Sequence, residues 1–241
     1  RQMGQGGESS VSGKVAVNFS LDHSGAGVLE VRHLTDDALA CDDAAWSVLD
    51  PPERLSVLLV TEGNPVLESA LRACPIATLD PCTPAGFDAM DPALFSGQDS
   101  YDVIVLDNHF PAQLPRCRYL TFGAVPEGLD VNTPGELENQ VIVDWRTRHP
   151  VLQYVNLTNL FASQSKRLQL PRDADVLAEF NESPALALLR RDGSTFLLAS
   201  FDVLQSNWPF EPSFVLFCYN ALNFLATQAG GGPQHELAVA E

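Results

Sequence analysis

Two apolar runs of strand length constrain the fold more than any other feature of the chain. Residues 55–60 read LSVLLV, and residues 103–106 read VIVL. A half-buried strand alternates apolar and polar residues, whereas a continuous apolar run is typical of a parallel strand that is covered on both faces. The two runs therefore predict an α/β domain in which residues 101–107 form a central strand.

The segments beside these runs extend the pattern. Pro65 suits the first turn of a helix, and the apolar residues from there to Cys74 fall on one stripe. Further strands are predicted at residues 76–79 and 119–123. The order β-α-β-linker-β-β, with right-handed crossovers, gives an open, mostly parallel, doubly wound sheet.

The second half adds an antiparallel portion. Strands are predicted at residues 166–170, 176–180, 185–190 and 194–201, with RRDGS as a hairpin turn between the last two. A final helix begins near Pro212 and has a broad apolar face. We assign residues 53–228 to this α/β domain.

The first fifty residues have a different pattern. Short strands are predicted at residues 15–21, 28–34 and 44–49, and DHSGAG suits an antiparallel connection between the first two. Because three short strands make too small a core, we interpret residues 15–52 as a small, partial Ig-like β-sandwich. Residues 1–14 and 229–241 are expected to be disordered. The start lacks an initiator methionine and a signal segment, which suggests a longer parent protein.

The acidic balance of the chain excludes one class of partner. Asp plus Glu number 31 against 14 Lys plus Arg, a net charge of -17, so a nucleic acid would be repelled. No apolar run approaches the roughly 18 residues of a membrane span, and we expect this segment not to cross a membrane. The cysteines lack CxxC spacing, which argues against a zinc knuckle, and Cys74 and Cys82 are near enough in sequence to pair.

Two loops at predicted strand ends are the candidate ligand-binding positions. Glu62, Gly63 and Asn64 follow the first strand, but a single glycine makes neither a dinucleotide motif nor a P-loop, and Glu62 would repel phosphate. As an alternative, the free amides at the helix N-terminus could bind a small acidic ligand. The simpler interpretation is that Gly63 permits the turn and Asn64 caps the helix.

Asp107, Asn108 and His109 follow the central strand, so they are expected at the carboxyl edge of the sheet, where open α/β folds bind ligands. Asp107 and His109 could share a proton or bind a metal. Adjacent residues on an extended chain point apart, however, and no second histidine has a ligand spacing. We therefore favour a hydrogen-bonded turn and assign no metal and no cofactor.

Two other motifs carry structural predictions. Residues 144–152, DWRTRHPVL, favour a loop that is anchored by pairing of Asp144 with an arginine and followed by a helical turn near Pro150. Trp208 and Phe210 are expected to pack over the sheet edge, and an exposed aromatic pair there would instead serve protein contact.

Several segments together resemble a known family. They are DDALACDDAAWSVLDPPERLSVLLVTEGNPVLESAL, YDVIVLDNHFPAQLP, DWRTRHPVLQYVNL and FLLASFDVLQSNWPFEPSFVLFCYNALNFLA. They are similar, over residues 15–227, to the region that follows the von Willebrand factor A module in membrane-anchored bacterial proteins related to the aerotolerance-operon family. The resemblance implies an Ig-like sandwich, then a class I glutamine amidotransferase-like, flavodoxin-like domain. It also implies an extracytoplasmic location, attached to a membrane protein.

The resemblance implies a test for one kind of catalytic site, a cysteine nucleophile. Amidotransferases of this class carry a nucleophilic cysteine at a sharp strand-to-helix elbow, with a downstream His and Glu. None of the five cysteines here has that setting: Cys41, Cys74, Cys82, Cys117 and Cys218. We therefore predict no catalytic residues and a non-catalytic interaction or scaffold module with protein partners. The alternatives are a hydrolase or transferase with a site near Asp107 and His109, and a carbohydrate- or peptide-binding domain.

Overall fold

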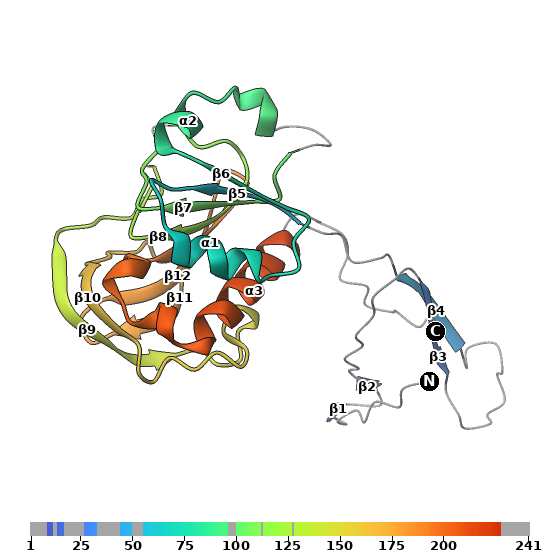
Figure 1. Ribbon diagram of the computed structural model, residues 1–241. Helices are drawn as coiled ribbons and strands as arrows, with labels where there is room; N and C mark the ends of the chain where they lie inside the picture. Colours follow the sequence, from blue (N-terminus) through green and yellow to red (C-terminus); the bar gives the residue numbers. More distant parts are fainter. Residues whose placement is uncertain are drawn as a thin grey trace. The chain divides into compact units, whose positions relative to one another are not determined.

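The computed structural model describes residues 9–11, 14–16, 27–32, 44–49, 55–95, 100–111, 113–126 and 128–227. The chain divides into two compact units, with the boundary between Glu53 and Arg54. Figure 1 shows the larger unit as a curved sheet with helices packed against it. The expectations for Cys41, for the first five residues of the turn (22–26) and for residues 229–241 lie outside the described residues.

A nine-stranded mixed sheet forms the larger unit, in the order β10-β9-β11-β12-β13-β8-β7-β5-β6. Its parallel half consists of β5 (Ser56–Val60), β6 (Thr78–Cys82), β7 (Val103–Asp107), β8 (Arg118–Phe122) and β13 (Ser194–Ala199). The runs in β5 and β7 are buried on both faces, because Leu58 and Ile104 lie in one core cluster and Leu59 and Val105 in the other. The mixed α/β fold with a large sheet is thus confirmed.

The other half of the sheet is antiparallel. It consists of β9 (Glu136–Trp145), β10 (Phe161–Lys166), β11 (Asp175–Phe180) and β12 (Pro184–Arg191), and β12 joins β13. Strand β10 bonds on its second side to the segment after β13: the Lys166 N–H donates to the Ser200 carbonyl at 2.7 Å, and Ala162 forms a bridge with Ser206. This half of the sheet therefore curls back on itself.

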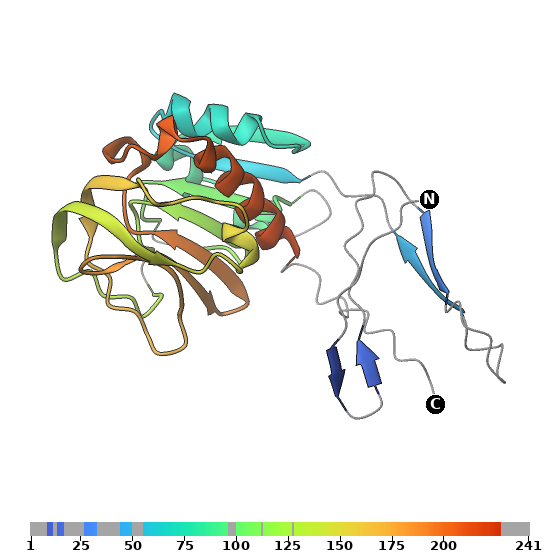
Figure 2. The same cartoon turned by 90° about the horizontal axis from the view of Figure 1, so that it is seen from below.

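Helices cover one face of the sheet. Figure 2 shows α1 (Pro65–Arg72) and α3 (Pro212–Thr227) on the same side, where Leu67, Leu71 and Phe217 enter one core cluster. The opposite face is covered by α2 (Pro84–Asp88) and by irregular segments. The remaining helical turns are η1 (Pro92–Phe95), η2 (Pro150–Leu152), η3 (Val203–Gln205) and η4 (Trp208–Phe210). None of the helices in the described chain has the length and apolar character that crossing a membrane requires.

The smaller unit contains two separate ribbons within its described residues. Strands β1 (Ser9–Val11) and β2 (Lys14–Ala16) pair with each other, as do β3 (Gly27–Arg32) and β4 (Ala44–Leu49), all antiparallel. The predicted pairing of residues 15–21 with 28–34 is therefore wrong where the structure describes it. The register of β3 and β4 places Val28 opposite Val48, an apolar cross-strand pair. Strand β1 falls inside the stretch for which the sequence predicts disorder.

Two other predictions are corrected by hydrogen bonding. The strand predicted at residues 166–170 ends at Lys166, because the Arg167 N–H donates to the Gly135 carbonyl and the Leu168 N–H to Ser183 Oγ, both in loops. The predicted pairing of Asp144 with an arginine is also wrong. Asp144 Oδ1 accepts from the Trp145 N–H at 2.8 Å.

The two aromatic residues that precede the last helix differ in their solvent exposure. Trp208 is fully buried, with a relative exposure of 0%, and stacks among core phenylalanines, whereas Phe210 is 88% exposed. Core packing is therefore confirmed for Trp208 and wrong for Phe210. Only one exposed aromatic ring, not a pair, remains at this position.

Candidate functional site at the carboxyl edge of the sheet

Asp107 ends β7 and lies between the loops that follow neighbouring strands. The Thr61 hydroxyl donates to Asp107 Oδ2 at 2.7 Å, and Asn64 Nδ2 donates to Oδ1 at 3.3 Å. Burial raises the pKa of Asp107 above its ordinary value, the two hydrogen bonds oppose this rise, and the charge of Asp202 adds to it. The buried carboxyl group thus ties the loop after β5 to the end of β7.

The loop after β5 has the geometry that the sequence predicts. Asn64 Oδ1 accepts from the Leu67 N–H at 3.0 Å, so Asn64 caps α1. Gly63 has a φ of +127°, which a side chain would rarely adopt. Glu62 is exposed and takes no part in the Asp107 hydrogen bonds. Of the three candidates in this loop, only Asn64 contacts Asp107.

Asn108 follows Asp107 and is held against the turn after β8. Its φ of +53° places it in the left-handed region, and its Nδ2 lies 3.5 Å from Asp107 Oδ1. On its other side, Asn108 Oδ1 occupies the space that a Cβ atom on Gly123 would need. Gly123 itself has a φ of +66°. The two turns therefore interlock, and the second one has room only for glycine.

His109 points away from Asp107, as expected for adjacent residues. Its Nε2 lies 3.1 Å from Asp88 Oδ1, and its ring meets Phe87 edge to face. The two candidates Asp107 and His109 thus belong to different hydrogen-bond groups. Within the described chain, His, Cys, Asp and Glu side chains form no group of three that could hold a metal ion.

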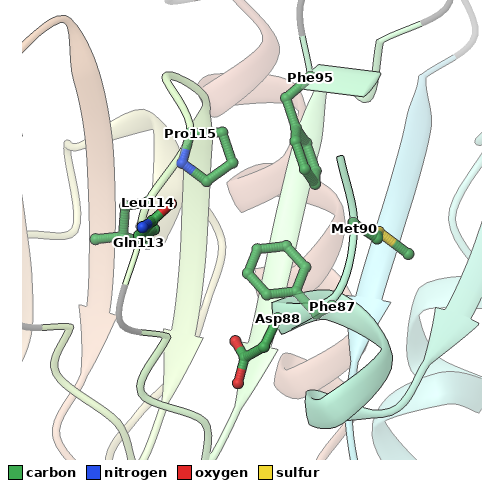
Figure 3. Close-up of a pocket in the computed structure, with 7 residues that line it drawn as sticks. All are labelled: Phe87, Asp88, Met90, Phe95, Gln113, Leu114 and Pro115. Carbon is green, nitrogen blue, oxygen red and sulfur yellow. The ribbon is translucent and has the colours of Figure 1, made fainter. Parts of the chain in front are cut away.

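A pocket of about 350 Å³ lies beside this His109–Asp88 pair. Figure 3 shows the rings of Phe87 and Phe95 facing the loop after β7, with the carboxylate of Asp88 at one margin. It is lined by Phe87, Asp88, Met90, Phe95, Gln113, Leu114 and Pro115. No pattern in the sequence predicts this pocket, because α2 and the loop after β7 meet only in the folded chain.

The four described cysteines are free and none is activated. Cys74, Cys82, Cys117 and Cys218 form no disulfide, so pairing of Cys74 with Cys82 does not occur. Burial raises the pKa of Cys74 and of Cys117 to about 11. Burial also raises the pKa of Cys82 and Cys218. Thiols with raised pKa values are poor nucleophiles at neutral pH.

The fold and this edge define a mixed α/β protein whose strand-end loops are joined by hydrogen bonds. Among solved structures, it is similar to cytoplasmic protein STM1381 from Salmonella typhimurium LT2, with a TM-score of 0.55 and 16% identity over 84% of this chain and 97% of that chain. It is also similar to cytoplasmic protein STM3548 from Salmonella typhimurium, with a TM-score of 0.55 and 14% identity over 83% of this chain and 96% of that chain. At these identities the likeness concerns the fold alone.

No family model and no curated protein matches the chain. The resemblance to the region after a von Willebrand factor A module therefore stays a prediction. Its implied extracytoplasmic location is corrected, because both similar structures are of proteins named cytoplasmic. That location was implied by the resemblance alone, and no residue of the chain carried it.

Proposed function

We propose that the larger unit is a non-catalytic interaction module with a protein partner, built on an amidotransferase-like, flavodoxin-like form of the α/β fold. The observation that carries the proposal is the turn after β8. Enzymes that perform acyl transfer at a sheet edge place a Ser or Cys on a sharp turn directly after a central strand. Here that turn contains Gly123, and the Asn108 side chain fills the space where a nucleophile would project.

The positions of the described histidines support the same proposal. A nucleophile needs a base within hydrogen-bonding reach. His109 bonds to Asp88, and His149 Nδ1 accepts from the Val151 N–H at 3.3 Å. In the described part of the chain, neither imidazole bonds to a cysteine or serine side chain.

An exposed apolar surface supports the interaction part of the proposal. Val141 on β9 lies opposite Phe161 on β10, and Val143 follows two positions along the same face. Val143 is 57% exposed, and the other two side chains are also exposed. We name these three residues the β9–β10 strip. Adjacent exposed apolar side chains are typical of protein contact surfaces.

The catalytic part is tested with the full chain and its single Cys→Ser variants. Hydrolysis of glutamine and of a nitrophenyl ester is followed for each protein. We expect every variant to show the same background rate as the parent chain, because none of the described thiols is poised for attack. Turnover that one Cys→Ser substitution abolishes would show that the module is an enzyme.

The interaction part is tested by placing a photo-crosslinking amino acid at Val143, in cells that express the full protein. The matched control places it at Ala73, an exposed residue at the end of α1. We expect a discrete crosslinked protein from position 143 and none from position 73. Equal crosslinking from both positions, or none from position 143, contradicts a partner on the β9–β10 strip.

A further inference from the structure

The pocket of Figure 3 has an apolar interior and a charged group at one margin. It encloses about 350 Å³, within the roughly 300–1,000 Å³ that is typical of small-molecule sites. Phe87, which is 4% exposed, is the most deeply buried of its lining residues. Met90, Phe95 and Leu114 are only partly buried against the same core cluster. Part of their apolar surface therefore stays accessible to a ligand in the pocket.

Asp88 provides the only ionisable side chain among the lining residues. This side chain is 49% exposed, so a ligand can reach it. His109 Nε2 lies 3.1 Å from Asp88 Oδ1, and within the described chain Oδ2 has no hydrogen-bond partner. A neutral imidazole that donates its N–H to Oδ1 orients the carboxylate and leaves it charged. The margin of the pocket thus presents an accessible, negatively charged acceptor.

Among the described residues, no arginine or lysine lines the pocket to neutralise this charge. Arg116 directly follows the lining residue Pro115 but extends towards the turn between β12 and β13. Its Cδ atom lies 4.0 Å from the place of a Cβ atom on Gly193, and the side chain lines a different cavity. The net charge of -17 adds a long-range attraction for cations. The chemical complement of this pocket is therefore an apolar group that carries one positive charge.

We propose that this pocket binds a small amine with an apolar body, whose ammonium group donates a hydrogen bond to the Asp88 carboxylate. The half-buried side chains of Phe95 and Leu114 provide the surface for the apolar body. Hydrogen bonds between two charged groups are roughly twice as strong as neutral ones, so an ammonium group is preferred to a hydroxyl. No residue of the β9–β10 strip lines the pocket, and the inference does not depend on the proposed protein contact.

Isothermal titration calorimetry with the full chain tests the ligand class. Phenylpropylamine, phenylpropanol and phenylpropanoate share one apolar body and differ in the charge of the end group. We expect the amine to bind with a Kd of roughly 0.1–10 mM, as suits a ligand this small. The alcohol and the carboxylate should each bind at least about threefold more weakly. No saturable binding of the amine, or binding of either analogue within about threefold of it, overturns the proposal.

Propylamine separates the pocket from the net charge of the chain. It carries the same ammonium group without the ring, so it leaves the apolar interior unfilled. It should bind at least about fivefold more weakly than phenylpropylamine. A smaller difference would show that the acidic chain attracts any cation, and it would overturn the proposal.

Variants test the position of the site. Asp88→Asn should weaken phenylpropylamine binding at least about threefold and remove its preference over phenylpropanol. The control is Glu179→Gln, which removes one exposed carboxylate from β11, outside the pocket, and should leave the Kd unchanged. Phe95→Ala is the second variant, should Asp88→Asn fold poorly, and it should weaken the amine and the alcohol alike. A change smaller than about threefold in both Asp88→Asn and Phe95→Ala places the ligand elsewhere and overturns the proposal.

Discussion

The side chain of Asn108 fills the space beside Gly123 that a Cβ atom would require. Their backbones are fixed as well: the Asn108 N–H donates to the Phe122 carbonyl at 2.9 Å, and the Gly123 N–H donates to the Ala199 carbonyl at 3.1 Å. The ends of β7, β8 and β13 are therefore joined in series. This arrangement stabilises the carboxyl edge and leaves its central turn without a reactive side chain.

Gly123→Ala should destabilise the protein by about 1–3 kcal/mol, because a side chain at left-handed φ is strained and would clash with Asn108. Urea unfolding of the full chain measures the loss. Gly135→Ala is the matched control, since Gly135 has open space around it and no positive φ. Equal effects at the two glycines would show that the contact with Asn108 is not tight.

Asn64→Ala should cost about 1–2 kcal/mol, because the change removes the cap of α1 and one donor to the buried Asp107 carboxyl group. Asn64→Ser separates the two effects, because a serine hydroxyl can cap the helix but is too short to replace the amide donor to Asp107. Urea unfolding should therefore place Asn64→Ser between the parent and Asn64→Ala. Identical stability of Asn64→Ala and the parent would contradict the capping role.

Local patterns predicted the elements that depend on nearby residues. The runs LSVLLV and VIVL are strands because full burial leaves them no polar face, and Asn64 caps its helix through an N–H only three residues away. Strand β9 is not predicted from the sequence, and the reason is again local. Gln140 and Ile142 are buried two positions apart, as in a regular strand, but Leu137 is buried three positions before Gln140. Asn139, which lies at this irregularity, has a φ of +54°. Such a shift removes the regular period that identifies a strand.

The contact between β10 and the segment after β13 could not be predicted in this way. Ser165 and Ser200 are 35 positions apart in the sequence, and they come together only because the Lys166 N–H donates to the Ser200 carbonyl. Likewise, Arg146 pairs with Asp175 across the sheet at 3.4 Å, although Asp144 is nearer in sequence. The register of β9 with β11 determines which aspartate lies beside Arg146. A short sequence segment does not contain this register.

Thiol labelling should distinguish the four described cysteines in a Cys41→Ser background. With pKa values of about 11, Cys74 and Cys117 have a thiolate fraction of about one in a thousand at pH 8. Cys218 is fully buried, whereas Cys82 is only partly buried. Mass spectrometry after N-ethylmaleimide treatment should therefore show one adduct, which Cys82→Ser removes. The same treatment in urea should give four adducts, and rapid native labelling of Cys74 or Cys117 would contradict this burial.

Asp107→Asn should change how stability depends on pH. Because burial raises the folded-state pKa of Asp107 above its ordinary value of 3.8, the native state binds more protons than the unfolded state between these two pKa values. The stabilising contribution of the protonated carboxyl group is thus fully present below pH 3.8 and is lost as pH rises through the folded pKa. The unfolding free energy of the parent should therefore fall relative to that of Asp107→Asn as pH rises from this value towards neutrality.

Urea unfolding of both proteins at a series of pH values isolates this effect, because all other titrating groups are common to the pair. Asp173→Asn is a control of opposite sign. The hydrogen bond from Arg191 lowers the pKa of Asp173, so its contribution is present above the unfolded pKa and is lost as pH falls. The parent should gain stability relative to Asp173→Asn as pH rises towards the unfolded pKa of 3.8, and it should lose stability relative to Asp107→Asn as pH rises above that value. Slopes of the same sign for the two variants would mean that burial does not dominate at Asp107, and that the Thr61 and Asn64 hydrogen bonds keep the carboxylate charged at the centre of the edge.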